Sequence, residues 1–185
     1  MPSIVFAKSQ GTWRDVADAA RTTVNMEAGV KEPSSSWKKK MLLAEHSPIR
    51  LLTFKWKWTD LKYWVSVHFV RHKIGIEHFV STQRTDRTGT NRDETVQSAP
   101  VNHECVANAQ AIITISRKRL CTQASAETRA AWKLVLEAFA SDHTELVSCC
   151  VPECVYRGFC PELKSCGFEK SPKFLTDLEK YRSLE

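Results

Sequence analysis

The segment from Ile49 to His72 most constrains the fold, because two hydrophobic periods follow one another within it. A strand is predicted over 49–58, where large apolar residues alternate with other residues: Leu52, Phe54, Trp56 and Trp58. The pair Thr59-Asp60 is a helix start signal, and in the helix predicted after it His68, Arg71 and His72 share one face. Because a buried charge without a partner is costly, this basic face predicts a nearby anionic ligand or carboxylate.

Hydrophobic spacing predicts the other elements in the same way. Helices are predicted over 13–28, 37–44 and 101–117 and from Ser125 onward, and extended structure over 76–83. Residues 84–100 are polar and predict a long functional loop that carries Arg84, Arg87 and Arg92. Together these elements predict an α/β (α+β) fold, with a mixed sheet flanked by helices and a helical C-terminal half.

Composition and charge narrow the class of protein. The 185 residues suit one domain with a small appendage, and the chain has no apolar run long enough for a transmembrane helix. Residues 1–15 lack the apolar core and cleavage site of a signal peptide, so a cytoplasmic location is expected. The net charge of +6 permits binding of nucleic acid or of phosphate-bearing small molecules. Since the charges are scattered along the chain, nucleic acid is the less favoured partner.

Segment 71–84 is central to the functional hypothesis, because it resembles the signature of the flavin-dependent thymidylate synthase (ThyX) family. In that signature Arg-His-Arg is followed by two serines and a final arginine. Here the first three positions are Arg71-His72-Lys73, Ile76 stands in place of the first serine, and Ser81 matches the second. The final arginine position falls on Gln83, or on Arg84 if the loop is one residue longer.

Three further segments follow the order and approximate spacing of that family. Asn108-Ala109-Gln110, followed by Arg119 and Glu127, resembles its second conserved region, although the family has arginine where Gln110 stands. Residues 45–48, Glu-His-Ser-Pro, resemble the segment that lines the flavin, and residues 20–23, Ala-Arg-Thr-Thr, look like the phosphate-side element. The resemblance implies the ThyX fold in a divergent, short member of phage or bacterial type.

The resemblance also implies a reaction and its ligands. Members of the family convert dUMP to dTMP with FAD as cofactor and NADPH and methylenetetrahydrofolate as co-substrates, and they are homotetramers with sites between subunits. FAD would be contacted by Thr23, Ser47, Arg71, His72, Lys73, His78, Asn108, Gln110 and Gln123. The nucleotide would be contacted by His68, Arg71, Ser81, Gln83, Arg84 and Arg119. Arg119 and Ser81 are the candidate catalytic residues, and Arg119 would stabilise negative charge developing on the uracil ring.

The spacing of Gln110 and Arg119 bears on assembly. Nine residues at 100° each place the two side chains about half a turn apart if one helix runs through both. Either the helix ends near Lys118, or the two residues serve different sites in an oligomer. Both alternatives fit a tetramer.

The departures from the family pattern keep a second function open. Lys73 lacks the planar fork of an arginine, and the replacements at Ile76 and Gln110 remove polar contacts. The alternative is a ThyX-fold protein that has lost methyl transfer and only binds flavin, nucleotide or a protein partner.

The cysteine-rich end of the chain predicts an extension over 146–185, after a FAD- and nucleotide-binding domain over 1–145. Short cysteine spacings between turn residues permit a structural zinc site with four ligands: Cys150, Cys154, Cys160 and Cys166. The usual paired Cys-x-x-Cys signature is missing, so reduced cysteines that pack the tail are the favoured interpretation. A basic, zinc-containing nucleic-acid-binding module is a third functional alternative.

Overall fold

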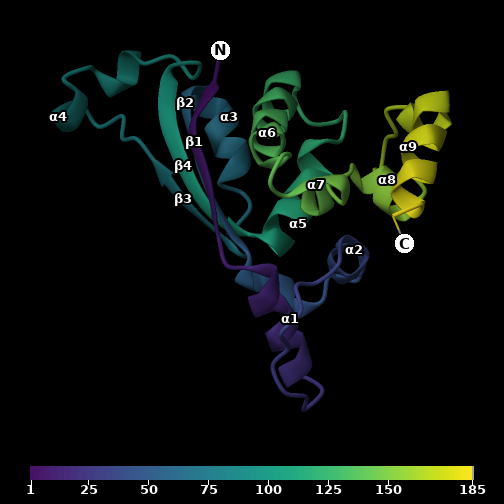
Figure 1. Cartoon of the computed structure of the whole chain (residues 1–185). Helices are drawn as coiled ribbons and strands as arrows, with labels where there is room; N and C mark the ends of the chain where they lie inside the picture. The colour runs from purple at the N-terminus through teal and green to yellow at the C-terminus, as the bar shows by residue number, and fades with distance from the viewer. Residues whose placement is uncertain (185) are drawn as a thin grey trace.

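Four strands form one sheet in the order β1-β2-β4-β3, in a computed structural model that describes residues 1–184 (Figure 1). The strands are β1 (Ser3–Gln10), β2 (Thr53–Lys62), β3 (Ile76–Val80) and β4 (Pro100–Asn108). All three strand pairs are antiparallel. The α/β fold class is thus confirmed, and its sheet is antiparallel where a mixed one was expected.

The helices gather on one face and one end of this sheet. In Figure 1, α3 and α6 lie on one side of the strands, α1 and α2 lie beyond their end, and α8 and α9 are farthest from the sheet. The α-helices are α1 (Trp13–Thr22), α2 (Ser35–Leu43), α3 (Tyr63–Phe69), α4 (Thr85–Thr88), α5 (Ala109–Arg119), α6 (Ala126–Phe139), α7 (Thr144–Ser148), α8 (Glu153–Arg157) and α9 (Pro172–Arg182). Short 3-10 helices are η1 (Ser47–Leu51), η2 (Arg92–Glu94) and η3 (Phe168–Lys170).

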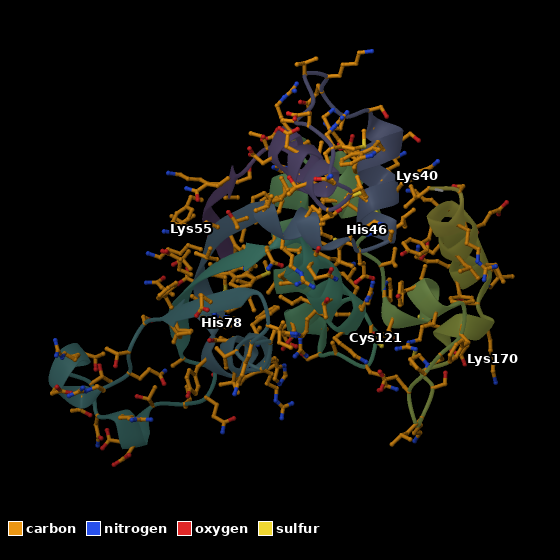
Figure 2. All side chains as sticks on the ribbon, turned by 90° about the horizontal axis from the view of Figure 1, so that it is seen from below. Lys40, His46, Lys55, His78, Cys121 and Lys170 are labelled. Carbon is orange, nitrogen blue, oxygen red and sulfur yellow. The ribbon has the colours of Figure 1, made fainter. Side chains whose placement is uncertain are left out.

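The predicted alternation in β2 is confirmed and builds the core. Trp56 and Trp58 are fully buried and lie opposite Cys105 and His103 of β4 in the sheet register. Lys55, which lies between Phe54 and Trp56 in the alternation, points away from the helices (Figure 2). Burial of indole rings on one face alone therefore fixes which side of the sheet the helices cover.

The boundaries predicted around β2 are wrong at both ends. Its start is displaced because Ser47–Leu51 forms η1, with a proline in the first turn, before the chain extends. At the other end, Asp60 adopts a positive φ of 55° where the pairing with β4 shifts register between Trp58 and Leu61. This bulge lets the strand continue to Lys62, so Thr59-Asp60 does not start the helix.

The helix predicted over 101–117 is wrong in its first half. Residues 100–108 form β4, in which alternate residues from Val101 to Ala107 are buried against the helices. The spacing of Cys105, Ala109 and Ile112 fits a helical stripe, but residues 103–107 pair with both β2 and β3. The sheet therefore overrides the helical pattern.

The remaining sequence predictions differ in outcome. Thr12 caps α1 in a capping box, but this helix ends at Thr22 and not at 28. Ser125 caps α6 as predicted, and the buried face of α6 includes Trp132, Val135, Leu136 and Phe139. β1 was not predicted, because the apolar residues at 4–7 are consecutive and do not alternate with polar ones.

The C-terminal residues separate from the main core after Cys150. The main cluster of buried apolar residues ends with Leu146, Cys149 and Cys150, and a second small cluster contains Cys154, Val155 and Phe174. Within residues 1–184, no helix has the length and apolar character needed to cross a membrane.

Candidate functional site

His68 and His72 meet Arg119 at the junction of α3 and α5, but the predicted helix face shared by His68, Arg71 and His72 is wrong. The Arg119 guanidinium donates from Nε to His72 Nε2 at 2.8 Å and from a terminal nitrogen to the His68 carbonyl oxygen at 2.6 Å. α3 ends at Phe69, so His72 lies in the turn that follows and not on the helix itself. Residues from two distant segments therefore orient Arg119.

The positive charge at this junction has no acidic partner. Among the ion pairs found over residues 1–184, none includes Arg71 or Arg119. Burial, followed by the positive charge of Arg71, lowers the pKa of Arg119 from its ordinary value. Two like charges without a carboxylate are compatible with an anionic ligand, and the anion expected from the sequence stays a prediction.

His72 is neutral in this arrangement. Burial, with the charges of Arg119 and His78 as smaller causes, lowers the pKa of His72 to about 4. Its Nε2 accepts the hydrogen bond from Arg119, which places the ring proton on Nδ1. His72 therefore orients Arg119 without adding a second positive charge.

His78 connects the junction to the sheet. Its Nε2 donates to the His72 carbonyl oxygen at 2.8 Å, and its Nδ1 lies 2.9 Å from His103 Nε2 and 3.3 Å from Cys105 Sγ. His103 and Cys105 are fully buried, and burial lowers the pKa of His103 to about 3. These three residues have ligand atoms within 4.8 Å of one another, so by geometry the group could hold a metal ion.

Gln110 lies on the other side of α5 from Arg119, as the 100° spacing requires. The helix includes both residues and ends at Arg119, one residue after Lys118. The Gln110 amide and the Arg117 guanidinium both donate to the Glu45 carboxylate. Gln110 is thereby held away from the Arg119 junction. The sequence placed Glu45 in the segment that resembles the flavin-lining one, but its partners and its left-handed φ of 50° after α2 are visible only in the structure.

Asn108 has a structural role at the start of α5. Its side-chain oxygen accepts from the Ala111 backbone N–H at 2.9 Å and caps the helix. Its side chain also lies against Gly75, where a Cβ would approach the amide nitrogen to 2.7 Å. With a φ of 72°, Gly75 is the residue type that this turn requires.

Thr23 and Ser47 line the same surface hollow, and their role in cofactor binding stays a prediction. They line a cavity of about 390 Å³ between α1 and η1, together with His46 and Pro48. Thr23 follows the end of α1, where its hydroxyl donates to the Ala20 carbonyl.

The other predicted ligand residues lie apart from the junction. The Ser81 hydroxyl accepts from the Asn102 backbone N–H at 3.0 Å, and Arg84 forms a two-pronged ion pair with Asp86. Gln83 precedes Arg84 on the same exposed arm, and the Lys73 side chain is exposed.

His68 and Gln123 have side-chain partners inside the chain. The His68 ring bonds with the Thr128 hydroxyl at 3.0 Å, so its backbone carbonyl and not its ring meets Arg119. Gln123 donates to the Lys164 carbonyl of the C-terminal extension at 2.6 Å.

The predicted zinc ligands divide into two groups. Cys154, Cys160 and Cys166 line one cavity, while Cys150 lines a different one beside α9. Cys121, which is not among the predicted ligands, lies at the first cavity. No local sequence signal joins it to cysteines more than 30 residues later.

Comparisons with known proteins agree with this architecture. No protein-family model and no curated protein matches the chain. Two crystal structures of the flavin-dependent thymidylate synthase ThyX from Helicobacter pylori, each with FAD and dUMP, match it with a TM-score of 0.64. One is 12% identical and covers 81% of this chain and 99% of its own, and the other is 11% identical and covers 82% and 99%. The sheet and helices described above are thus those of a distant structural relative, and the chain has the fold of the flavin-dependent thymidylate synthases.

Proposed function

We propose that this protein is a flavin-dependent thymidylate synthase, which converts dUMP to dTMP with FAD, NADPH and methylenetetrahydrofolate. The observation that carries the proposal is the half-buried Arg119 beside Arg71, with no carboxylate partner among residues 1–184. A pyrimidine nucleotide supplies anionic oxygens for such a pair. The helicobacter relatives that share the fold bind FAD and dUMP.

The residues present are compatible with FAD. Thr23 and Ser47 border one hollow that suits a phosphate-bearing group, and the Arg71 side chain is exposed and unpaired within residues 1–184. FAD would be held by Thr23, Ser47, Arg71 and His72. In its reduced form it would supply the hydride that reduces the one-carbon group transferred to dUMP.

Arg119 carries the electrostatic part of the mechanism. Negative charge develops on the oxygens of the uracil ring as the ring is attacked or deprotonated, and a fixed cation lowers the free energy of that state. His72 and the His68 carbonyl hold the guanidinium through neutral acceptors, so its charge is not cancelled. A preorganised cation of this kind needs no rearrangement during the reaction.

A second candidate function is ligand binding without methyl transfer. Gln110 is engaged with Glu45, and Ile76 is buried in the sheet opposite Ala107, so two family positions offer the cofactor no polar group. A protein of this kind would bind flavin and nucleotide but would leave reduced flavin unoxidised when dUMP and the folate are added.

The experiment combines binding and turnover. We expect the purified protein to bind FAD in equilibrium dialysis and to oxidise reduced flavin only when dUMP and methylenetetrahydrofolate are both present. Arg119→Ala should still bind FAD and lose about 10²–10³-fold in kcat, and Arg119→Lys should rescue it poorly. Lys118→Ala is the matched control, because Lys118 is exposed on the same helix end and faces Glu153 and Glu162.

Two results would contradict the proposal. Wild-type protein that binds FAD but shows no dUMP-dependent oxidation supports the binding-only function. Equal kcat for wild type and Arg119→Ala would remove Arg119 from the reaction, even if the protein turns over.

A further inference from the structure

Four cysteines from two distant parts of the chain surround one cavity. Cys121 lies in the turn between α5 and α6, Cys154 lies on α8, and Cys160 and Cys166 lie in the segment 158–167. All four line the same cavity of about 300 Å³. We propose that Cys121, Cys154, Cys160 and Cys166 bind one structural zinc ion that fastens the C-terminal extension to the α5–α6 turn.

Contacts around the cavity already bring the extension to this turn. The Thr122 hydroxyl lies 2.6 Å from Cys166 Sγ, and the Gln123 amide donates to the Lys164 carbonyl at 2.6 Å. Lys118 lies 3.7 Å from the Glu162 carboxylate. Because these contacts are polar and exposed, each contributes little to the stability of the folded chain. Bonds from both segments to one metal ion would hold the extension against the α5–α6 turn more firmly.

The extension lacks the apolar core that would otherwise hold it. After Cys150, where the main core ends, its buried apolar residues are Cys154, Val155 and Phe174, and residues 158–167 contain no helix or strand. Small units with so few buried residues are commonly stabilised by a metal or by disulfides. All seven cysteines are free thiols, so no disulfide serves that purpose here.

The thiols lie close enough to affect one another. Burial is the main cause that raises the pKa of Cys154, to about 11, and the neighbouring Cys121 and Cys160 raise it further. The pKa of Cys121 is raised in the same way by burial, with Cys166 and Cys160 contributing. Backbone N–H groups of Gln123 and Val155 act in the opposite direction on Cys121 and Cys154, because they stabilise the thiolates. Hydrogen bonds of this kind commonly support thiolate ligands of zinc.

The sulfurs must move inward to bind the ion. Zinc–sulfur bonds of about 2.3 Å place tetrahedral sulfurs about 3.8 Å apart. Within residues 1–184, a group of three or more ligand atoms that all lie within 4.8 Å of one another occurs only at His78, His103 and Cys105, so the four sulfurs are farther apart than this. The irregular segment 158–167 can make this adjustment, because Gly158 and Gly167 give it left-handed turns at both ends. Binding forms four Zn–S bonds and releases the four thiol protons to solvent.

The His78, His103 and Cys105 group is the weaker metal candidate. His78 Nδ1 and His103 Nε2 already form a hydrogen bond of 2.9 Å, and His103 and Cys105 are fully buried in the sheet. It offers three ligands and lines none of the cavities described above. The hydrogen bonds within it account for its close packing without an ion.

The metal content of the intact protein tests the proposal without reference to catalysis. We expect about one zinc per chain after purification and dialysis, and substitution with cobalt(II) should give the visible and sulfur-to-metal absorption of thiolate ligation. Cys166→Ser removes one of the four ligands and should lose most of the zinc. The variant should still fold, because Cys166 is exposed and its substitution opens no cavity in the core. Cys150→Ala is the matched control and should keep one zinc, because Cys150 lines another cavity.

Thiol titration of the wild-type protein provides a readout that needs no variant. With zinc bound, the exposed Cys166 thiol should react slowly with an aromatic disulfide reagent. A chelator should make all four ligand thiols reactive, Cys166 among them. Folded protein that contains no zinc and takes up none would overturn the proposal. Loss of zinc from Cys150→Ala to the same extent as from Cys166→Ser, with both variants folded, would overturn the ligand set.

Discussion

His103 shows most clearly how one residue couples this fold to pH. Its ring is fully buried beside Trp58 and Phe69, and its Nδ1 has no hydrogen-bond partner among residues 1–184. Burial, with the charge of His78 as a smaller cause, lowers the pKa of His103 to about 3. The neutral ring therefore belongs to the folded state, and protonation favours unfolding.

Stability should accordingly fall in mild acid. Because the folded pKa of His103 lies below the unfolded value of about 6.5, its contribution is complete above pH 6.5 and is lost as the pH falls toward 3. Each such histidine adds a slope of up to about 1.4 kcal/mol per pH unit to the free energy of unfolding. Urea denaturation of wild type and of His103→Leu between pH 7 and 5 measures this slope. We expect a shallower slope in the variant, and equal slopes would show that His103 is not the group responsible.

At the scale of elements, the junction between β4 and α5 fixes both the sheet and the helix that carries Arg119. Asn108 is the last residue of β4 and also the N-cap of α5. Its backbone N–H bonds to the Gly75 carbonyl, which ties the turn before β3 to the same point. One residue thus sets the start of α5 relative to the His72 turn.

Variants of Asn108 should separate capping from cofactor binding. Asn108→Ala should lower the free energy of unfolding by about 1 kcal/mol, because the Ala111 N–H loses its cap. Asn108→Asp keeps an oxygen acceptor and should retain most of that stability. If the amide also contacts FAD, as the ThyX resemblance implies, Asn108→Asp should bind FAD more weakly while it unfolds at nearly the wild-type urea concentration. Asn108→Ala as stable as wild type would exclude the capping role.

At the scale of the whole molecule, the segment after β3 extends away from the helices as an arm that contains α4 (Figure 1). The side-chain hydrogen bonds of Arg84, Thr88 and Asn91 are made within the arm itself. Among residues 1–184, no hydrogen bond or ion pair joins Arg84 to the Arg119 junction of its own chain. If Gln83 and Arg84 bind the nucleotide, we expect them to do so in another subunit.

We therefore expect a homo-oligomer with shared sites, and specifically a tetramer. Light scattering should give a mass that is a multiple of the 21.1 kDa chain. Mixing inactive Arg84→Ala with inactive Arg119→Ala should restore part of the dUMP-dependent oxidation, because some sites then combine two intact residues from different chains. A monomer in solution, or no recovery in a mixture that exchanges subunits, would contradict the shared site.

The sequence predicted those features that depend on residues close together in the chain. The tryptophan alternation in β2 and the amphipathic pattern of α6 predicted those elements, since one buried face repeats with the period of its own backbone. The half-turn between Gln110 and Arg119 was predictable for the same reason, whereas the contact of Arg119 with His72 depends on the turn after α3.

Tertiary structure decided the features in which the local pattern was ambiguous or silent. Val101–Ala107 fits a helical stripe or a strand, and only the neighbouring strands β2 and β3 make the strand more favourable. The partners of Glu45 and the grouping of Cys121 with Cys154 join residues far apart in the chain. Local periodicity determines which face of an element is buried, but the residue that a side chain meets there is determined by how the elements pack, and that depends on the free energy of the whole fold.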